Sequence, residues 1–340
     1  MNSPTTKIAV FGAGSIGCYL GGLLQSQGAN VVFIGRERLK NAVKKNGLTL
    51  THFQKKSIYL NAKKVSVETS PSVLKNCDLI LLCTKSQDTS VAAQDILSHA
   101  QSGAHIISCQ NGIGNVAVLT EALGTPFKIS GAIVPFNVTP TGPATFHCGT
   151  GGALHFENAL PEDVRSAFQS AGQDTQYGGN FQGDQWAKLL INLNNALNTL
   201  SGGTLREGLL QKDYRWAFAK LLQEGLNIAK AKDIEMGRYN GRSPAIVIKI
   251  LRLPNYLYRP LIDYFVRIDA KARSSMLDDL EIGRESEIEF LQGEIVRQGK
   301  IMGLEAYANT KVLEAVNLAF AKGVSPKLSG TEIRNLIKKR

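Results

Sequence analysis

The sequence predicts an α/β domain with a parallel sheet, followed by an all-α domain. Three features of the 340 residues support this prediction. Short, β-branched apolar runs alternate with helical patterns through the first half of the chain. A regularly spaced group of glycines follows the first of these runs, and the pattern beyond Gly183 is helical. Because Gly178 and Gly179 interrupt the last short strand pattern, we place the domain boundary there, between 1–180 and 181–340.

A glycine-rich turn follows the first strand pattern. The apolar run from Ile8 to Phe11 has the length of a buried strand, and Cys18 to Gln27 has a helical pattern. The turn between them consists of Gly12, Ala13, Gly14, Ser15, Ile16 and Gly17. In Gly-x-Gly-x-x-Gly, the first glycine allows a tight turn, the second lets backbone amides approach a pyrophosphate, and the third lets the helix pack closely on the strand. Because free amides at a helix N-terminus bind phosphate, this stretch predicts a Rossmann-type dinucleotide-binding domain.

The end of the second strand pattern bears on which dinucleotide binds. This run, Asn30 to Gly35, ends about where an acid would hold a ribose 2′-hydroxyl. Arg36 stands at that place instead, and Arg38 lies nearby. A guanidinium pairs with a 2′-phosphate, which an acid would repel, so the sequence favours NADP(H) over NAD(H). The alternative is that Arg36 is a solvated charge at a strand end.

Polar residues follow two further strand patterns. Lys85 comes soon after the run Asp78 to Cys83, and Asn111 follows the run Ala104 to Cys109. Since ligands bind at the carboxyl ends of strands in open α/β sheets, we expect both side chains at the cofactor crevice, with the amide near a nicotinamide and a substrate carbonyl. The alternatives are a loop lysine in water and an ordinary Asn-Gly turn.

The rest of the first domain is less regular. From 128 to 156, β-like runs separated by prolines and glycines predict a meandering edge of the sheet instead of another β-α unit. A helix over 161–171 and a short strand over 174–177 complete the domain.

The chain is basic, with a formal net charge of +11. Between Arg36 and Lys64 there are nine lysines or arginines and a single acid, Glu37. Positive potential beside a 2′-phosphate site attracts a polyanionic cofactor and an anionic substrate. Neither a nucleic-acid motif nor a series of stacking aromatics accompanies the charge, so the sequence argues against a nucleic-acid partner.

Cysteine usage and hydropathy indicate a cytoplasmic, soluble protein. The sequence shows neither a leader pattern before the first strand nor an apolar run long enough to span a bilayer. The five cysteines form no Cys-x-x-Cys pair and are expected to be buried thiols, with no metal and no catalysis assigned to them. They are Cys18, Cys77, Cys83, Cys109 and Cys148.

The first helix of the second domain is predicted over Gln185 to Leu200. Lys188, Asn192 and Asn195 follow a spacing that places them on one face of such a helix. Four asparagines in this stretch oppose helix propensity, which a polar, ligand-facing stripe in an interdomain cleft explains. A plain solvated face is the alternative.

The remaining residues predict further helices. Apolar segments between 233 and 273 are interrupted by prolines, and an interfacial or oligomer contact there stays open. Ser274-Ser275-Met276 leads into a long helical pattern that extends to Ile295, with acids expected to be mostly solvated. A final helix is predicted from about Thr310 to Lys322.

Several separated motifs now occur in the order typical of one family. They are the glycine turn, Gln110-Asn111-Gly112, Trp186-x-Lys188-Leu189 with Asn192, Ser274-Ser275-Met276, and Gly283-Arg284-x-x-Glu287-Ile288. By these motifs, nearly the whole chain resembles the ketopantoate reductases (2-dehydropantoate 2-reductases). The resemblance implies a cytoplasmic enzyme that reduces ketopantoate to pantoate with NADPH, for the synthesis of pantothenate, a coenzyme A precursor. The oligomeric state stays open, and a homodimer is one alternative.

The resemblance also implies roles for single residues. Lys188 matches the family's catalytic lysine, which contacts the substrate, and Glu287 stands where the family has a glutamate near the nicotinamide and the reacting centre. Asn111 matches an asparagine shared by cofactor and substrate. Besides the residues of the glycine turn, the matches to cofactor-binding positions are Arg36 and Lys85, and the matches to substrate contacts are Asn192 and Ser275.

One departure from the family concerns the substrate. A second substrate asparagine is expected four residues beyond Asn192, where this chain has Ala196, and Asn195 is the candidate to replace it. The region 242–273 also looks longer than in compact members. Two alternatives therefore stay open: an NADP-dependent reductase of another branched or aromatic 2-keto acid on the same fold, or a regulator that senses NADP(H) without turnover.

The chemistry of 2-keto acid reduction fits these residue types. The reaction needs a hydride at the carbonyl carbon, a proton at the developing alkoxide and a holder for the carboxylate. We expect Lys188 to act as the general acid, Glu287 to orient it or the substrate hydroxyl, and Ser275 with the asparagines to bind the substrate.

Overall fold

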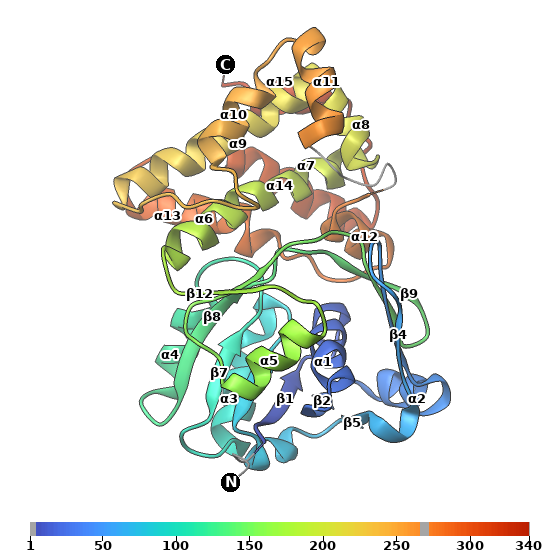
Figure 1. Ribbon diagram of the computed structural model, residues 1–340. Helices are drawn as coiled ribbons and strands as arrows, with labels where there is room; N and C mark the ends of the chain where they lie inside the picture. The colour runs from blue at the N-terminus through green and yellow to red at the C-terminus, as the bar shows by residue number, and fades with distance from the viewer. Residues whose placement is uncertain (1–4, 266–271, 340) are drawn as a thin grey trace. The chain divides into compact units, whose positions relative to one another are not determined.

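A computed structural model describes residues 5–265 and 272–339 of the protein (Figure 1). The chain divides into two compact units, Met1–Phe181 and Gln182–Arg340. We call them the first and the second unit and describe each by itself.

The first unit is built on an eight-stranded sheet. Six neighbouring strands, from β5 to β8 in the sheet, are parallel, whereas β11 is antiparallel to β8. In sheet order the strands are β12 (Thr175–Tyr177), β11 (Leu154–Phe156), β8 (Lys128–Ile133), β7 (His105–Ser108), β6 (Leu79–Leu82), β1 (Lys7–Phe11), β2 (Asn30–Ile34) and β5 (Ser66–Glu68). The α/β, Rossmann-type prediction is confirmed for this unit.

Helices cover both faces of this sheet (Figure 1). Strand β1 shows the reason, because Ile8 and Val10 belong to one buried apolar cluster and Ala9 and Phe11 to another. The first cluster includes residues of α1 and α5, and the second includes residues of α3 and α4. The helices of the unit are α1 (Ser15–Ser26), α2 (Glu37–Asn46), η1 (Ala62–Lys64), η2 (Pro71–Asn76), η3 (Ser86–Asp88), α3 (Thr89–His99), α4 (Asn115–Leu123) and α5 (Glu162–Ser170).

A second, four-stranded sheet corrects the sequence prediction for 128–156. The two ends of this stretch, β8 and β11, do lie in the main sheet, but the strands between them leave it. Thr145–Cys148 pairs with Leu48–His52 from the basic stretch, and Val138–Gly142 pairs with Thr145–Cys148. In order, the strands are β4 (Ile58–Leu60), β3 (Leu48–His52), β10 (Thr145–Cys148) and β9 (Val138–Gly142). The buried side chains of Leu48 and Leu50 lie so close to α1 that a Cβ atom on Gly22 would be 2.8 Å from a methyl carbon of Leu50. Packing on α1 therefore draws this sheet away from the main one.

Helices are the regular elements of the second unit in its described residues, apart from an isolated β-bridge between Tyr239 and Arg242, which confirms the all-α prediction. Its elements are α6 (Phe181–Asn192), α7 (Asn194–Ser201), α8 (Leu205–Leu210), α9 (Lys212–Ala231), α10 (Pro244–Leu251), α11 (Asn255–Phe265), α12 (Ser275–Glu281), η4 (Ile288–Phe290), α13 (Gln292–Ile301), α14 (Tyr307–Lys322) and α15 (Gly330–Ile337).

Two predicted helix boundaries in this unit are wrong. The pattern from Ser274 to Ile295 is not one helix, because α12 ends at Glu281 and Gly283 adopts a left-handed φ of +66°. The helix predicted near Thr310 is not the last one, because α15 follows it. A capping box on Ser329 and Glu332 starts that additional helix.

A buried arginine connects α8, α10 and α11. Arg215 of α9 is 1% exposed, and its guanidinium donates hydrogen bonds to the carbonyl of Leu209 at 3.0 Å and that of Leu251 at 3.2 Å. It also binds Asn255 Oδ1 at 2.6 Å and lies over the ring of Tyr258. Because carbonyls at helix C-termini carry partial negative charge, they stabilise the cation without a buried acid. Arg215 therefore joins the ends of α8 and α10 to α11.

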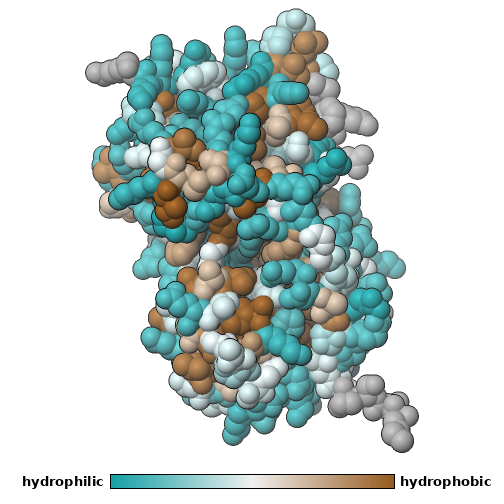
Figure 2. All heavy atoms as spheres, turned by 90° about the vertical axis from the view of Figure 1, so that its left-hand side faces the viewer, coloured by the Kyte–Doolittle hydropathy of each residue, from teal (hydrophilic) through white to brown (hydrophobic). Residues whose placement is uncertain are grey.

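The surface is mainly hydrophilic, with separate hydrophobic areas, as Figure 2 shows for one face. Exposed large apolar side chains include Ile246, Tyr256 and Leu257 of α10 and α11. Within the described residues, no helix combines the length and the hydrophobicity needed to cross a bilayer.

Candidate active site

The glycine turn of the first unit assigns a different task to each glycine. Gly12 has a φ of +93°, and a Cβ atom there would be 2.5 Å from the backbone nitrogen of Thr84. A Cβ atom on Gly17 would be 2.4 Å from the carbonyl oxygen of Gly12. Gly14, in contrast, would meet no atom within 4 Å. The first and third glycines are therefore needed for packing, and the second borders open space that a ligand can fill.

The N-terminus of α1 faces the same turn. Gly14 is its N-cap and provides no side-chain cap, and the first turn of α1 contains no acid. The amides of Ser15 and Ile16 belong to this turn, where a helix offers them no acceptor of its own. Twelve residues of aligned peptide dipoles add partial positive charge. The residues present thus fit a bound pyrophosphate.

Strand β2 brings Arg36 to this turn. The amides of Gly12 and Ala13 both donate to the carbonyl of Ile34, at 3.1 and 2.9 Å. A Cβ atom on Gly35 would be 2.9 Å from Cβ of Ala13, so the end of β2 and the turn are in close contact. Arg36 follows as the exposed N-cap residue of α2. Arg36 therefore lies close to the turn in the chain, and its contact with a 2′-phosphate stays a prediction.

Two acids lie near this strand end. Glu37 follows Arg36 directly and is exposed. Glu68 is paired with Ile34 in the sheet, and its carboxylate forms an ion pair with Lys40 at 3.0 Å, which offsets part of its negative charge at this edge.

Lys85 and Asn111 lie beyond the carboxyl ends of the neighbouring strands β6 and β7. Ser86 Oγ donates to the carbonyl of Asn111 at 2.9 Å, and Asn115 Nδ2 donates to the same oxygen at 2.8 Å. Both predicted residues are half-buried. The structure thus brings them to the edge of the sheet that carries the glycine turn, because parallel strands end on the same side.

Gln110 holds these two strand ends together, a role that the motif Gln-Asn-Gly did not reveal. Its side chain is buried, and Nε2 donates to the carbonyl of Lys85 at 3.2 Å and to Thr89 Oγ1 at 2.8 Å. Its Oε1 accepts from Ser108 at 2.9 Å. A buried amide with several partners fixes the loop that carries Lys85.

In the second unit, the helix predicted over Gln185 to Leu200 is broken. Helix α6 starts earlier, at Phe181, and ends at Asn192, and α7 starts at Asn194. Between them, the carbonyl of Leu193 accepts a hydrogen bond from Gln292 Nε2 at 2.8 Å. Leu193 keeps helical backbone angles, φ −58° and ψ −22°. The backbone at this residue therefore gives no local reason for the break.

Lys188 and Asn192 both lie in α6, one turn apart. Lys188 is only 7% exposed, and Asn192 is half-buried. Residues four apart share one face of a helix, so these two side chains are neighbours. A buried ammonium beside an amide is the arrangement that a carbonyl and its developing alkoxide require.

The asparagines of α7 have two kinds of role. Asn194 accepts a hydrogen bond from the Tyr214 hydroxyl at 2.9 Å, and Asn198 is fully buried, so both serve the packing of the unit. Asn195 is half-buried and follows the break. The polar residues are therefore not a single stripe on one helix. Ala196 is 0% exposed, so this position does not present a side chain at the surface of the unit.

Ser275 is the first residue of α12, which Ser274 caps. Ser274 Oγ accepts from the amide of Leu277 and donates to the carbonyl of Asn195, both at 3.2 Å. This contact places the start of α12, where Ser275 follows Ser274, against α7, although 79 residues separate Ser274 from Asn195.

Glu287 lies between α12 and α13. It is half-buried and precedes η4 as its N-cap residue. The amide of Gln292, five residues later, is bound to Leu193, which ties the segment with Glu287 to the junction that follows Asn192. The second unit thus gathers Lys188, Asn192, Asn195, Ser275 and Glu287 on connected segments.

The cysteines show the expected burial. Four of the five are buried, and Cys83 is half-buried. Burial raises the pKa of the Cys77 thiol to about 11 and that of Cys148 above its ordinary value. Such thiols are poor nucleophiles near neutral pH. Among the described residues, no group of three His, Cys, Asp or Glu is arranged to hold a metal ion.

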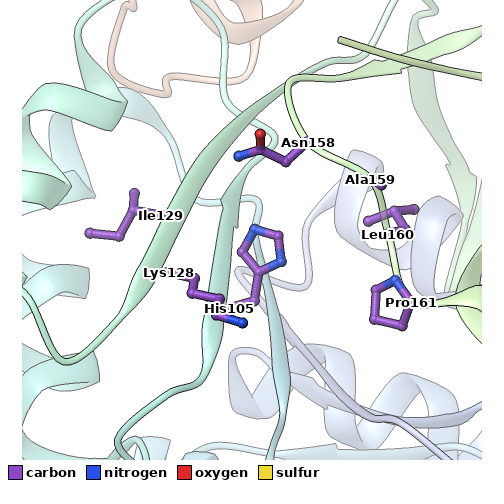
Figure 3. A pocket seen from close by; sticks show the side chains of 7 residues that line it. All are labelled: His105, Lys128, Ile129, Asn158, Ala159, Leu160 and Pro161. Carbon is purple, nitrogen blue, oxygen red and sulfur yellow. The ribbon is translucent and has the colours of Figure 1, made fainter.

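A hollow of about 520 Å³ in the first unit lies away from the predicted residues. Figure 3 shows His105 and Lys128 on neighbouring strands, facing Leu160 and Pro161. His105 and Lys128 are the first residues of β7 and β8, so this hollow borders the amino ends of the strands. Ligands of open α/β sheets bind at the opposite edge, where the glycine turn lies.

Two family models match the chain over most of its length. The model described as "Ketopantoate reductase PanE/ApbA" matches residues 8–160, and the model described as "Ketopantoate reductase PanE/ApbA C terminal" matches residues 180–319. A 2-dehydropantoate 2-reductase of Pyrococcus horikoshii is 30% identical over 317 residues, which are 89% of this chain and 94% of the relative.

Solved structures show the same fold. A PanE/ApbA family ketopantoate reductase from Ralstonia eutropha superposes with a TM-score of 0.80 at 28% identity, over 94% of this chain and 99% of that one. A D-mandelate dehydrogenase bound to NADH and anilino(oxo)acetate gives a TM-score of 0.76 at 21% identity, with 94% and 99% covered. A dimeric ketopantoate reductase from Staphylococcus aureus gives 0.70 at 19% identity, with 93% and 99% covered. The last two likenesses concern the fold alone.

Proposed function

Because the chain belongs to the ketopantoate reductase family, we propose that it reduces 2-dehydropantoate to pantoate with NADPH. The observation that carries this proposal is the buried side chain of Lys188, placed one helical turn before Asn192. A hydride acceptor becomes an alkoxide, and a buried cation beside a hydrogen-bonding amide stabilises that charge most strongly. In cells, such an enzyme supplies pantoate for pantothenate synthesis.

The first unit is proposed to hold the cofactor. The space beside Gly14 and the free amides of α1 suit the pyrophosphate, and Arg36 suits the 2′-phosphate of NADP(H). Lys85 and Asn111, at the neighbouring strand ends, are proposed to contact the cofactor, and Asn111 also the substrate. When bound, the reduced nicotinamide supplies the hydride for the keto carbon.

The second unit is proposed to hold the keto acid. Lys188 polarises the keto oxygen and donates a proton to it as the general acid, and Glu287 orients this ammonium or the product hydroxyl. Ser275 and the amides of Asn192 and Asn195 bind the carboxylate and the hydroxyl of the substrate. These groups come from segments that Gln292 and Ser274 tie together.

A second candidate function is the reduction of another branched or aromatic 2-keto acid. Ala196 favours it, because the asparagine expected there is missing. Without that amide, the pocket offers less polar contact to the pantoyl hydroxyl, and a less polar keto acid loses nothing in comparison. If Asn195 supplies the missing contact, 2-dehydropantoate is the favoured substrate. If it does not, the second candidate function is favoured.

Oxidation of NADPH and of NADH with a panel of 2-keto acids tests both candidates. We expect the highest kcat/KM for 2-dehydropantoate with NADPH. A higher value for an aromatic or another branched keto acid would establish the second function. NADPH binding without turnover of any member would instead identify a protein that senses the cofactor.

Replacement of Lys188 by Ala tests the role of the ammonium. We expect kcat to fall by at least about a hundredfold, because the general acid and the buried charge are both lost, while the Kd for NADPH changes little. The variant Lys249→Ala removes an exposed lysine of α10 and serves as the control with unchanged kinetics. Equal turnover of the Lys188→Ala variant would remove this lysine from the mechanism.

The variant Arg36→Ala tests the choice of dinucleotide. It should raise the KM for NADPH by roughly tenfold or more and leave that for NADH nearly unchanged, because a charge-assisted hydrogen bond to the 2′-phosphate is lost. Lys44→Ala, at the exposed end of the same helix α2, is the matched control.

A homodimer is also proposed, and light scattering of the purified protein measures this assembly.

A further inference from the structure

Asn198 is a fully buried amide whose two ends are both used. It is 0% exposed, in α7. Its Nδ2 donates to the carbonyl of Gly203 at 2.9 Å, and its Oδ1 accepts from the backbone amide of Ser274 at 2.9 Å. A buried polar side chain in a helix opposes both propensity and the apolar core, so its partners explain its presence.

These partners fix the chain directly before Ser275. The carbonyl of Ala272 accepts from Leu205 at 2.9 Å, and Ser274 is held by Asn198 and by the carbonyl of Asn195. Ser275 follows at once as the first residue of α12. The direction of its side chain therefore depends on where the amide of Ser274 is held.

The ion pairs of this segment are partly open to water. Arg273 binds Asp278 and Glu281, whose side chains are 39% and 53% exposed, although its own Nε and Nη2 atoms are buried. Water reaches the acids of these pairs and weakens them. The contact between Ser274 and Asn198 is buried, and loss of a buried hydrogen bond leaves the amide without a partner.

We propose that Asn198 is a positioning residue for the 2-keto acid, which it affects through Ser275. This inference rests on the proposed function. The amide holds the start of α12 against α7, so that the hydroxyl of Ser275 stands beside Asn195 and meets the polar end of the substrate. Hydrogen bonds to a substrate depend on placement within a fraction of an ångström, so a shift of this segment weakens binding without removing any group that touches the substrate.

The variant Asn198→Ala tests the proposal, with Asn194→Ala as the matched control. Asn194 lies in the same helix and loses a comparable hydrogen bond, to Tyr214. For Asn198→Ala we expect the keto acid KM to rise roughly tenfold, with kcat changed less than about threefold and the Kd for NADPH unchanged. For Asn194→Ala we expect a similar loss of thermal stability and a KM within about twofold of the wild type.

A double-mutant cycle with Ser275→Ala shows whether Asn198 acts through Ser275. If it does, Asn198→Ala raises the KM no further once Ser275 has been replaced. Additive effects of the two substitutions would overturn the inference, and so would equal KM values for the Asn198→Ala and Asn194→Ala variants.

A second variant covers the case in which Asn198→Ala does not fold. Asn198→Asp keeps an acceptor for the amide of Ser274 and loses the donor to Gly203, so it should be less stable but keep a KM near the wild-type value. A tenfold rise in this variant would contradict the proposal. A wild-type protein without reductase activity would refute the proposed function itself, whereas an active wild type with unaltered variants would refute only the role of Asn198.

Discussion

The glycine turn of the first unit and the broken helix of the second unit are assembled in opposite ways. The turn is a short continuous stretch, and its contacts with Ile34 and Thr84 are made by backbone atoms. The broken helix depends on side chains from distant parts of the chain. Gln292 is 99 residues away from its partner Leu193, and Ser274 is 76 residues away from Asn198.

This difference shows where each site is vulnerable. A binding turn made of backbone tolerates many side chains and fails only where a Cβ atom cannot fit. A site made of side chains on separate segments fails wherever one long-range contact is lost. In the glycine turn, a substitution should therefore change either stability or binding, depending on whether a Cβ atom fits. In the broken helix, loss of one long-range contact should change both.

The largest effect is expected for Gly12→Ala. The new methyl group would meet the backbone of Thr84 at 2.5 Å, and φ of +93° is strained for alanine. The first unit should lose about 3 kcal/mol or more of its free energy of unfolding, because neither backbone segment can yield cheaply. Hydrogen exchange of the β1 and β6 amides measures this loss.

Gly14→Ala is the matched variant in the same turn. Its Cβ atom would meet nothing within 4 Å, and its backbone angles suit alanine. We expect the free energy of unfolding to change by less than about 1 kcal/mol, while the affinity for NADPH falls because the methyl group occupies space meant for the pyrophosphate. Equal losses of stability in the two variants would contradict the roles assigned to these glycines.

A smaller effect is expected for Gln292→Leu in the second unit. The substitution leaves the buried carbonyl of Leu193 without its hydrogen bond, at a cost of about 1–3 kcal/mol. Both tryptophans, Trp186 and Trp216, lie in this unit, so their fluorescence during urea unfolding measures the loss. The keto acid KM should rise as well, because Asn192 adjoins the junction.

Gln298→Leu is the control for this variant. Gln298 lies in the same helix, α13, and donates to Glu294, which also binds Arg297. Within the described residues, the Oε1 atoms of Gln292 and Gln298 are both buried without a hydrogen-bond partner. Replacement by leucine therefore removes the same unsatisfied oxygen in the two variants. A loss of stability as large as that of Gln292→Leu would show that the contact with Leu193 is not special.

The same contrast explains what the sequence could predict. The tasks of Gly12, Gly14 and Gly17 follow from local spacing, and the structure gives each the surroundings that the spacing predicts. Apolar runs and helical periodicity were sufficient for the main sheet and the all-α unit. These features depend on contacts between residues that are close in sequence or on patterns that repeat.

The features that the sequence did not reveal depend on distant contacts. Leu193 has helical backbone angles, and only the remote Gln292 explains the break beside it. The second sheet pairs β3 with β10 across about a hundred residues, and no local pattern shows which distant strand a short strand will pair with. Gly283 did offer a signal, since glycine in a left-handed conformation commonly ends a helix.

Mild acid should lower the stability of the first unit more than that of the second. This is the smallest of the expected effects. All five histidines lie in the first unit, and burial lowers the pKa of His105 and of His52, with Lys128 and Lys55 as additional causes. A lowered pKa means that the unfolded chain binds more protons than the folded one, so stability falls as the pH drops below the ordinary histidine value of 6.5. The loss ends below the folded pKa. Because both rings are partly exposed, we expect less than about 1 kcal/mol.

Hydrogen exchange at pH 7 and pH 5.5, followed in each unit, measures this difference. The first unit should lose protection relative to the second, which has no histidine to protonate. In His105→Gln, the amide can still bond to Ser130, whose Oγ is 2.8 Å from His105 Nε2, but it does not titrate, so part of the acid effect should disappear. If the second unit lost protection first, the acid response would arise from carboxylates such as Asp213, whose pKa is lowered by hydrogen bonds from Arg334 and Thr331, and the contrast drawn from histidine would be wrong.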